Sequence, residues 1–397
     1  MTVAHSSAGL VRTATAGAIA MAVAMGFGRF AYTPILPGMM AGLGLSPSDA
    51  GLIASANFVG YLAGAVLAGF GWATGRERLV GLAALLATAI LLLAMGVTTS
   101  IAGFVVIRFL AGVASAFTMI FLSSIVLGRA ARVRNPHVQS VHFGGVGIGI
   151  ALSSLMVYLL PNIDIGDLAG WRLDWLFSAA IALAGMAAVS FLLQGDTVTA
   201  AAPVREPPLV WSRPLTVLTL TYGLFGFGYV ITATFLVAMA REGAADTTIE
   251  FLAWFITGLS AAVSIYLWGR LVPVLGLVGV YMAGLLVEAI GLVLAVSLPL
   301  PLAPLVGGLL LGLTFLMITA FGLQIGRLLS PQSPRKALAF MTAAFGVGQI
   351  IGPIVAGWLA ESGGYTLPTL IAAAVLLFCA LMLAVEGKRI SAAIASA

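Results

Sequence analysis

Long apolar runs almost without charge set the strongest limit on how this chain can fold. Twelve of them follow one another along the 397 residues, each close to the ~20 residues with which a helix crosses the hydrocarbon core of a bilayer. Hydrophobic residues make up 61% of the chain and charged residues 8%, whereas soluble domains carry about 25% charged residues. Such a chain cannot cover a surface that faces water, so lipid must solvate it. The runs lie at roughly 14–40, 49–72, 79–98, 101–127, 138–160, 172–194, 214–240, 249–269, 275–297, 301–328, 336–360 and 367–386.

The basic residues between the runs predict the orientation of the chain. If the N-terminus is cytoplasmic, the cytoplasmic loops hold fourteen of the 18 Lys and Arg residues, and the opposite side holds only Arg172 and Arg241. Cytoplasmic loops of membrane proteins carry such an excess. We therefore expect a multi-pass protein with both termini in the cytoplasm, whose basic character reflects topology and lipid contact rather than nucleic-acid binding. The fourteen are Arg12, Arg76, Arg78, Arg129, Arg132, Arg134, Arg205, Arg213, Arg270, Arg327, Arg335, Lys336, Lys388 and Arg389.

An internal repeat divides the chain into two halves. Gly26-Phe27-Gly28 recurs 200 residues later as Gly226-Phe227-Gly228, and Gly145-Val146-Gly147 recurs 201 residues later as Gly346-Val347-Gly348. Matches at one nearly constant offset indicate two homologous units. We predict an N-terminal bundle over 1–194, a proline-containing linker over 195–213 and a C-terminal bundle over 214–397.

Two local patterns carry a family resemblance. Arg108-Phe109-Leu110-Ala111-Gly112 fits an Arg-x-x-x-Gly pattern, and the segment from Gly26 to Pro37 reads Gly-Phe-Gly-Arg-Phe-Ala-Tyr-Thr-Pro-Ile-Leu-Pro. With the twelve runs and the repeat, they resemble the major facilitator superfamily, and the second resembles its bacterial YbfB/YjiJ-type group. The resemblance implies an all-α membrane protein of twelve transmembrane helices in two pseudo-symmetric six-helix bundles, set in the bacterial inner membrane. It also implies that helices 1, 4, 7 and 10 line a central cavity.

Two departures from the superfamily bear on function. The stretch 71–78 after the second run lacks the aspartate that usually stands there, although Glu77 could replace it. The fifth run lacks the Gly-Pro pattern of proton-driven drug exporters, which appears instead as Gly352-Pro353 in the eleventh run. These departures weigh against drug efflux.

Few ionisable residues lie inside the runs: Arg29, Arg108, Glu288 and, near a helix end, His142. A charge at mid-bilayer costs about 2.5–3.5 kcal/mol on insertion scales, so it must face a cavity or a partner. Two arginines against one glutamate leave a surplus positive charge, which an anionic ligand would balance. For Arg29 the alternative is a structural arginine that caps carbonyls freed by Pro34 and Pro37.

The other three ionisable residues each have two interpretations that the sequence leaves open. Arg108 would contact the substrate or relay protons, or it would only brace the first helix. Glu288 would be a proton-coupling group, or it would be a polar residue packed against a neighbouring helix. His142 would be a proton carrier, although a histidine at the membrane interface is the commoner case.

Polar and aromatic residues at helical spacing complete the predicted site. We expect five of them to line it together with Arg29 and Arg108, although each could instead hydrogen-bond between helices without touching a substrate. The five are Tyr32, Asn57, Tyr61, Tyr229 and Gln349.

The sequence favours a transporter over an enzyme. Three histidines and one cysteine make no metal-ligand cluster, and no Gly-rich loop ends in Lys-Ser/Thr, so we expect no metal, no cofactor and no use of ATP. The predicted function is secondary active transport of a small organic anion, a carboxylate, by alternating access with proton symport; we expect a monomer that contacts membrane lipids. The alternative is a proton-driven exporter of amphipathic drugs or metabolites.

Overall fold

The computed structural model describes residues 2–132, 137–160, 168–193 and 206–395, and over these ranges it contains helices and no strand. The part of the chain so described includes twelve helical spans that are long and apolar enough to cross a membrane, as the sequence predicts. The predicted ends shift by several residues: the first span begins at residue 9 rather than 14, and the last helix continues to Ala395. The basic residues Arg134 and Arg205 and most of the predicted linker lie outside the described residues.

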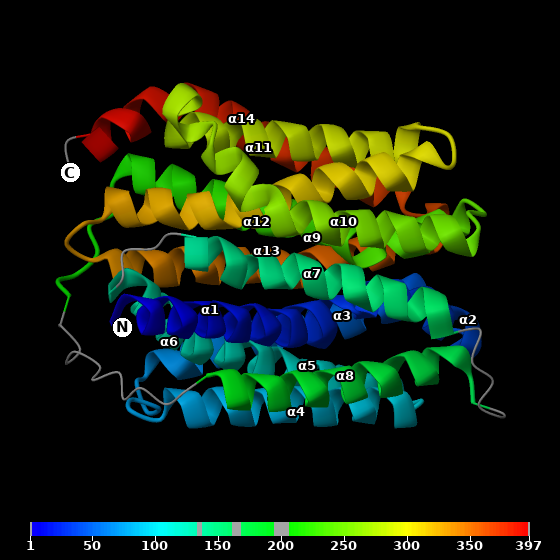
Figure 1. The fold of residues 1–397 in the computed structure, drawn as a ribbon. Helices are drawn as coiled ribbons and strands as arrows, with labels where there is room; N and C mark the ends of the chain where they lie inside the picture. Colours follow the sequence, from blue (N-terminus) through cyan, green and yellow to red (C-terminus); the bar gives the residue numbers. More distant parts are fainter. Residues whose placement is uncertain (1, 133–136, 161–167, 194–205, 396–397) are drawn as a thin grey trace.

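The first six spans form one group of parallel and antiparallel helices and the last six form another (Figure 1). In the first group, spans one and four are interrupted by π-helical segments, η1 and η2. Its elements are α1 (Thr2–Met21), η1 (Ala22–Phe30), α2 (Tyr32–Leu43), α3 (Pro47–Gly69), α4 (Glu77–Val97), α5 (Ile101–Phe117), η2 (Thr118–Leu122), α6 (Ser123–Arg132), α7 (His137–Leu159) and α8 (Gly170–Leu192). The second group comprises α9 (Arg213–Glu242), α10 (Thr247–Gly269), α11 (Val272–Ser297), α12 (Leu302–Leu329), α13 (Pro334–Gly363) and α14 (Thr366–Ala395). We call these groups the N-lobe and the C-lobe.

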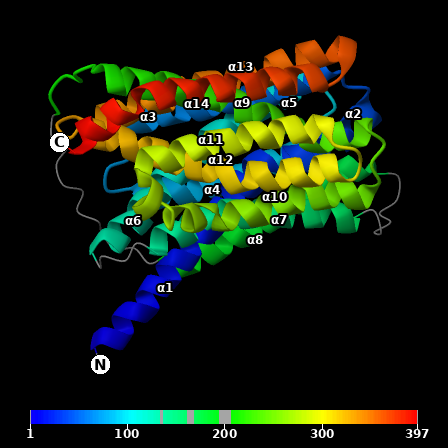
Figure 2. The same ribbon diagram turned by 90° about the horizontal axis from the view of Figure 1, so that it is seen from above.

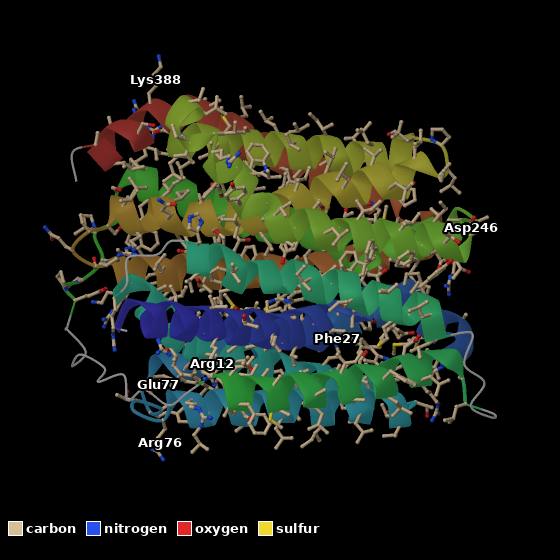
Figure 3. The ribbon with its side chains drawn as sticks, in the orientation of Figure 1. Arg12, Phe27, Arg76, Glu77, Asp246 and Lys388 are labelled. Atoms are coloured by element: carbon tan, nitrogen blue, oxygen red, sulfur yellow. The ribbon has the colours of Figure 1, made fainter. Side chains whose placement is uncertain are left out.

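Both termini lie at one end of the molecule, which we call the terminal end, and we call the opposite one the far end (Figure 1). The first turns of α1 extend beyond the bundle on this side (Figure 2). Figure 3 shows Arg12, Arg76 and Lys388 toward the terminal end and Asp246 at the far end. The charge asymmetry of the sequence is therefore an asymmetry between the two ends of one bundle.

Capping residues at the start of equivalent helices in the two lobes follow the internal repeat. Ser46 caps α3: its Oγ accepts from the Asp49 amide at 3.1 Å, and Asp49 Oδ2 accepts from the Ser46 amide at 3.0 Å. Asp246, 200 residues later, caps α10 by accepting from the Ile249 amide at 2.9 Å. The repeat thus extends to the residues that start equivalent helices.

Glycines set the closest helix contacts within each lobe. A Cβ at Gly60 would overlap the carbonyl oxygen of Phe109, and one at Gly112 would overlap that of Asn57, so α3 and α5 touch through their backbones. In the C-lobe, Gly312 packs in the same way against the carbonyl of Thr257, which joins α12 to α10. Small residues at such crossings allow helices in lipid to gain close packing.

The lobes meet along two seams, α3 against α13 and α7 against α10. Gly51 lies against the Pro353 carbonyl in the first seam, while Gly147 and Gly258 face each other's backbone in the second. At the far end α2 also packs on α9. Direct backbone contact at glycines therefore forms both seams.

Hydrogen bonds between the lobes are confined to the half near the far end, as far as the described residues show. The Thr33 hydroxyl donates to the Ala233 carbonyl at 2.6 Å, and the Ser55 hydroxyl donates to the Ile350 carbonyl at 2.8 Å. The remaining bonds in this half join Ser154 to the Phe251 carbonyl at 2.9 Å, the Ser48 amide to the Glu361 carboxylate at 3.1 Å, and the Tyr158 and Thr248 hydroxyls at 3.5 Å. Polar bonds between the lobes therefore hold the far end closed. Among the described residues, no such bond joins the lobes in the terminal half.

Candidate functional site

Arg29 lies inside η1, in the stretch of the first span where the helix widens to the π form. The guanidinium-bearing side chain is buried, with 4% of its surface exposed. Phe27, two residues earlier, lies between the two ends of the bundle (Figure 3). A π-helical insertion often accompanies a functional residue because it re-aims side chains out of the regular helical register.

Aromatic rings surround the Arg29 guanidinium. Its central carbon lies 4.5 Å from the ring centre of Phe58, 4.7 Å from that of Tyr61 and 5.5 Å from that of Phe30. Cation–π attraction offsets part of the cost of burying the charge. However, Nε and Nη2 are buried without any hydrogen-bond partner, and no carboxylate forms an ion pair with Arg29 among the described residues. Its hydrogen-bonding capacity is therefore available.

Arg108, unlike Arg29, is hydrogen-bonded to the backbone of the first span. Its Nη1 donates to the Gly28 carbonyl and its Nη2 to the Arg29 carbonyl, both at 3.1 Å, and its guanidinium lies 4.9 Å from the Tyr32 ring centre. In a π-helix the Arg29 carbonyl would bond to the amide five residues on, but that residue is Pro34, which has no N–H. Arg108 therefore donates to the carbonyl that Pro34 leaves without an amide donor, a contact that fits the bracing interpretation of Arg108.

The other predicted N-lobe residues surround this brace. The Asn57 amide donates to the Arg108 carbonyl at 3.0 Å and leaves its own oxygen unpaired. The Tyr32 hydroxyl donates to the Ala50 carbonyl at 3.0 Å, and the Tyr61 hydroxyl contacts the Met119 sulfur at 2.7 Å. Tyr61 also touches Arg29, so of these three it lies nearest to the unpaired guanidinium.

Tyr229 and Gln349 form the C-lobe side. They are hydrogen-bonded to each other, and the Gln349 Oε1 is buried without a partner. The Tyr229 ring is nearly parallel to those of Phe315 and Phe345, with centroids 5.8 and 5.7 Å away. Phe30 of the N-lobe contacts Phe315 at 6.0 Å, so the ring system is continuous across the lobe boundary. The structure thus links the two predicted halves of the site through aromatic contacts.

The candidate site residues predicted from the sequence did not include five aromatic residues of this region: Phe30, Phe58, Trp254, Phe315 and Phe345. Phe58 directly follows Asn57 and stands three residues before Tyr61, so helical spacing could have identified it. Phe30 adjoins Arg29, but Phe315 and Trp254 come from the other lobe, and their approach to Phe30 needs the tertiary structure.

Glu288 is completely buried in α11, and neither carboxylate oxygen has a hydrogen-bond partner. The Thr314 hydroxyl lies beside it but donates to the Leu310 carbonyl of its own helix at 2.7 Å. The Tyr229 hydroxyl lies within electrostatic range of both Arg29 and Glu288. Arg29 and Glu288 therefore both act electrostatically on Tyr229.

His142 is fully buried and lies near the start of α7, so it is enclosed by protein even though it stands close to a helix end. Its Nε2 shares a hydrogen bond of 2.7 Å with the Ser123 hydroxyl, and its Nδ1 faces Gly17 of α1. The ring lies between α1, α6 and α7 inside the N-lobe and makes no contact with Arg29 or Glu288.

The arrangement combines a guanidinium with unpaired donors, an unpaired amide oxygen and apolar aromatic walls. Such a set can bind a planar oxyanion through the arginine fork and an organic body through the rings. The described residues include no group of His, Cys, Asp or Glu side chains that could hold a metal ion.

The sequence matches a family model and a plant transporter. A family model described as "Uncharacterised MFS-type transporter YbfB" matches residues 21–384. The chain is 30% identical over 175 residues to the probable high-affinity nitrate transporter 2.4 of Oryza sativa subsp. japonica. That match covers 42% of this chain and 35% of the relative, so the chain spans about a third of the relative's length.

Solved structures share the fold at low sequence identity. The nucleoside transporter NupG superposes with a TM-score of 0.73 at 15% identity over 96% of this chain and 99% of that one. A bacterial homologue of the human lysosomal transporter Spinster, in an inward-facing and occupied conformation, superposes with a TM-score of 0.70 at 14% identity over 96% of both chains. These likenesses establish the major facilitator fold.

Proposed function

Because this chain belongs to the family described as uncharacterised MFS-type transporters of the YbfB type, we propose that it moves a small organic anion, a carboxylate, across the bacterial inner membrane by alternating access. Transport and the twelve-span fold follow from the family and the architecture. The substrate class rests on the site.

The observation that carries the proposal is the buried, unpaired guanidinium of Arg29. A mid-membrane charge without a protein partner is costly, and an anion that pairs with Nε and Nη2 would remove that cost. Nitrate, the anion in the rice relative's name, is planar and also fits an arginine fork. The aromatic surroundings of Arg29 favour an oxyanion attached to an organic body, which is why we propose a carboxylate.

The proposed mechanism is a tilt of the N-lobe (1–194) against the C-lobe (214–397) about the midplane site. We propose that the terminal end is cytoplasmic, because fourteen basic residues are assigned to that side and two to the other. The lobe-crossing hydrogen bonds would then close the periplasmic half, as an inward-facing state requires, and we propose that the protein works as a monomer. Opening the other side would break these bonds, Thr33 to Ala233 among them.

The alternative function, proton-driven export of amphipathic drugs or metabolites, has one observation in its favour. The parallel rings of Tyr229, Phe315 and Phe345 could stack against a flat apolar compound without any anionic group. Arg29 argues against it, because a neutral or cationic ligand would leave that charge unpaired.

A thermal-shift screen of the purified protein separates the two functions. We expect organic acids to raise the apparent melting temperature by several degrees, because a ligand at about 100 times its Kd stabilises the folded state by about 2.7 kcal/mol. Amides and alcohols of matched shape should give no rise. Stabilisation only by neutral or cationic amphiphiles would reject the anion proposal and favour the alternative.

Glu288 is the proposed proton-coupling residue, in view of its burial without a partner and its electrostatic interaction with Tyr229. We expect Glu288→Gln, in proteoliposomes, to lose uptake driven by an imposed pH gradient while counterflow of labelled substrate continues. Glutamine keeps the shape of the side chain but binds no proton, so the two assays separate coupling from binding.

Two further variants complete this experiment. His142→Gln, in the N-lobe, tests the second candidate in the same assays, and we expect it to keep gradient-driven uptake because Ser123 and α1 enclose the ring. Tyr229→Phe should keep uptake driven by the pH gradient if the Tyr229 hydroxyl takes no part in proton transfer to Glu288. Full gradient-driven uptake by Glu288→Gln would remove Glu288 from the mechanism.

A further inference from the structure

A cavity of about 250 Å³ opens at the far end, within the C-lobe. It lies between the end of α9, the α11–α12 connection and the α13–α14 connection, so no N-lobe residue lines it. Its walls are part apolar and part polar: Leu236, Met239, Leu298 and Pro304 are among the apolar side chains, and Glu242, Tyr365 and Thr366 are the polar ones. The volume is below the ~300–1,000 Å³ of sites for drug-sized ligands, so any occupant is small.

The Tyr365 side chain is built into this cavity. It is only 5% exposed, and its ring stacks on Phe235 with centroids 4.8 Å apart. Its hydroxyl is buried and has no hydrogen-bond partner. Burying a hydroxyl without a partner is unfavourable, so a hydrogen bond from an occupant of the adjoining cavity would stabilise this group.

The Glu242 carboxylate supplies charge at the same place. It makes no hydrogen bond or ion pair with any described residue, and Arg241 beside it is already paired with Glu250, with Nε to Oε1 at 2.8 Å. Gly364 adopts φ +68°, and a Cβ there would overlap Glu242 Oε1. Only glycine therefore allows the chain to turn while the carboxylate lies against the backbone.

The charged groups that act on Tyr365 are carboxylates. Burial and the nearby carboxylates of Glu242 and Glu361 raise the pKa of Tyr365, so its phenol stays neutral at physiological pH. Glu361 is engaged with the Ser48 amide, which leaves Glu242 as the unpaired carboxylate of the cavity. A neutral phenol oxygen and a carboxylate oxygen both accept hydrogen bonds from an ammonium group.

We propose that this cavity is a second ligand site, which binds a small organic cation with a primary ammonium group on a short apolar body. The ammonium pairs with the Glu242 carboxylate and donates to the Tyr365 hydroxyl, and the apolar body contacts Leu236, Met239, Leu298 and Pro304. The charge preference is the opposite of that at Arg29. The two sites also differ in place, because Arg29 lies in the first span between the two ends, whereas this cavity is at the far end of the C-lobe.

Isothermal titration of the purified protein with hexylammonium chloride tests the proposal, with n-hexanol and sodium hexanoate as probes of matched length. We expect saturable binding of hexylammonium and at least tenfold weaker binding of the other two. Glu242→Gln should weaken hexylammonium binding at least tenfold, and Tyr365→Phe should weaken it several-fold. The control Glu77→Gln alters a carboxylate on the other side of the molecule and should bind as the unaltered protein does.

Absence of hexylammonium binding, equal binding of hexanol, or unchanged binding by Glu242→Gln would each overturn the proposal. Glu242 is exposed, so Glu242→Gln should fold, and its melting temperature without ligand verifies this. The experiment is independent of the anion site: organic-acid binding should be the same in Glu242→Gln and in the unaltered protein.

Discussion

Replacing Arg29 with glutamine is expected to weaken binding of the organic anion at least about 30-fold. The substitution removes the positive charge and the unpaired Nε and Nη2 donors that make up the proposed anion contact. Truncating one partner of a buried, hydrogen-bonded charge pair costs about 2–5 kcal/mol, which corresponds to a Kd at least roughly 30-fold higher. Titration of the most stabilising acid from the thermal-shift screen measures this change.

A matched pair of variants separates charge from shape at the same position. Arg29→Lys keeps a positive charge but offers a single donor point rather than a planar fork, so its affinity should fall between those of Arg29→Gln and the unaltered protein. Without ligand, Arg29→Gln should be at least as stable as the unaltered protein, because it removes a buried charge that no carboxylate balances. Normal anion transport by Arg29→Gln would refute the proposed role.

The twelve spans could be predicted from the sequence because lipid permits few solutions. A backbone in hydrocarbon must satisfy its own hydrogen bonds, so every apolar run of the right length becomes a helix. The ends were less accurate, since helices such as α14 continue past the apolar run into polar sequence up to Ala395. Cap residues such as Ser46 and Asp246 mark the starts of α3 and α10 better than hydropathy does.

The roles within the site could be predicted only in part. Burial of Arg29 and Arg108 follows from their place in apolar runs, but which of them caps the freed carbonyls depends on how α5 meets η1. The π form of η1 has no signal in the sequence apart from the prolines that follow it. The ring contacts of Phe315 and Trp254 with Phe30 arise between lobes, where helical spacing within one segment carries no information.

The two lobes supply aromatic side chains to the site more evenly than the repeat suggests. Pairing Arg29 with Tyr229 across the duplication predicts charge from the N-terminal half and mainly aromatic and amide contacts from the C-terminal half. The N-lobe also supplies the rings around Arg29, Phe58 and Tyr61 among them, and the C-lobe holds the buried Glu288. The lobes therefore differ in that only the N-lobe provides the unpaired guanidinium, that of Arg29, whereas both lobes provide aromatic side chains around the site.

The Arg108→Lys variant is expected to show the reverse of the Arg29 result: a marked loss of stability with most of the anion affinity retained. Lysine preserves the charge but cannot span two carbonyls as the guanidinium does at Gly28 and Arg29. A buried carbonyl left without its donor costs about 1–3 kcal/mol, so the apparent melting temperature should fall by several degrees. Because the loosened carbonyl belongs to Arg29 itself, anion affinity should fall by less than tenfold through imperfect positioning.

Comparison of the two arginines decides between bracing and direct substrate contact. A brace predicts that Arg108→Gln, which can reach one carbonyl at most, is destabilised at least as much as Arg108→Lys, and that saturating anion restores part of the loss in both. Direct contact predicts unchanged stability and an affinity loss as large as that of Arg29→Gln. The second pattern would contradict the brace, because both terminal nitrogens of Arg108 are already bonded to the backbone on which Arg29 stands.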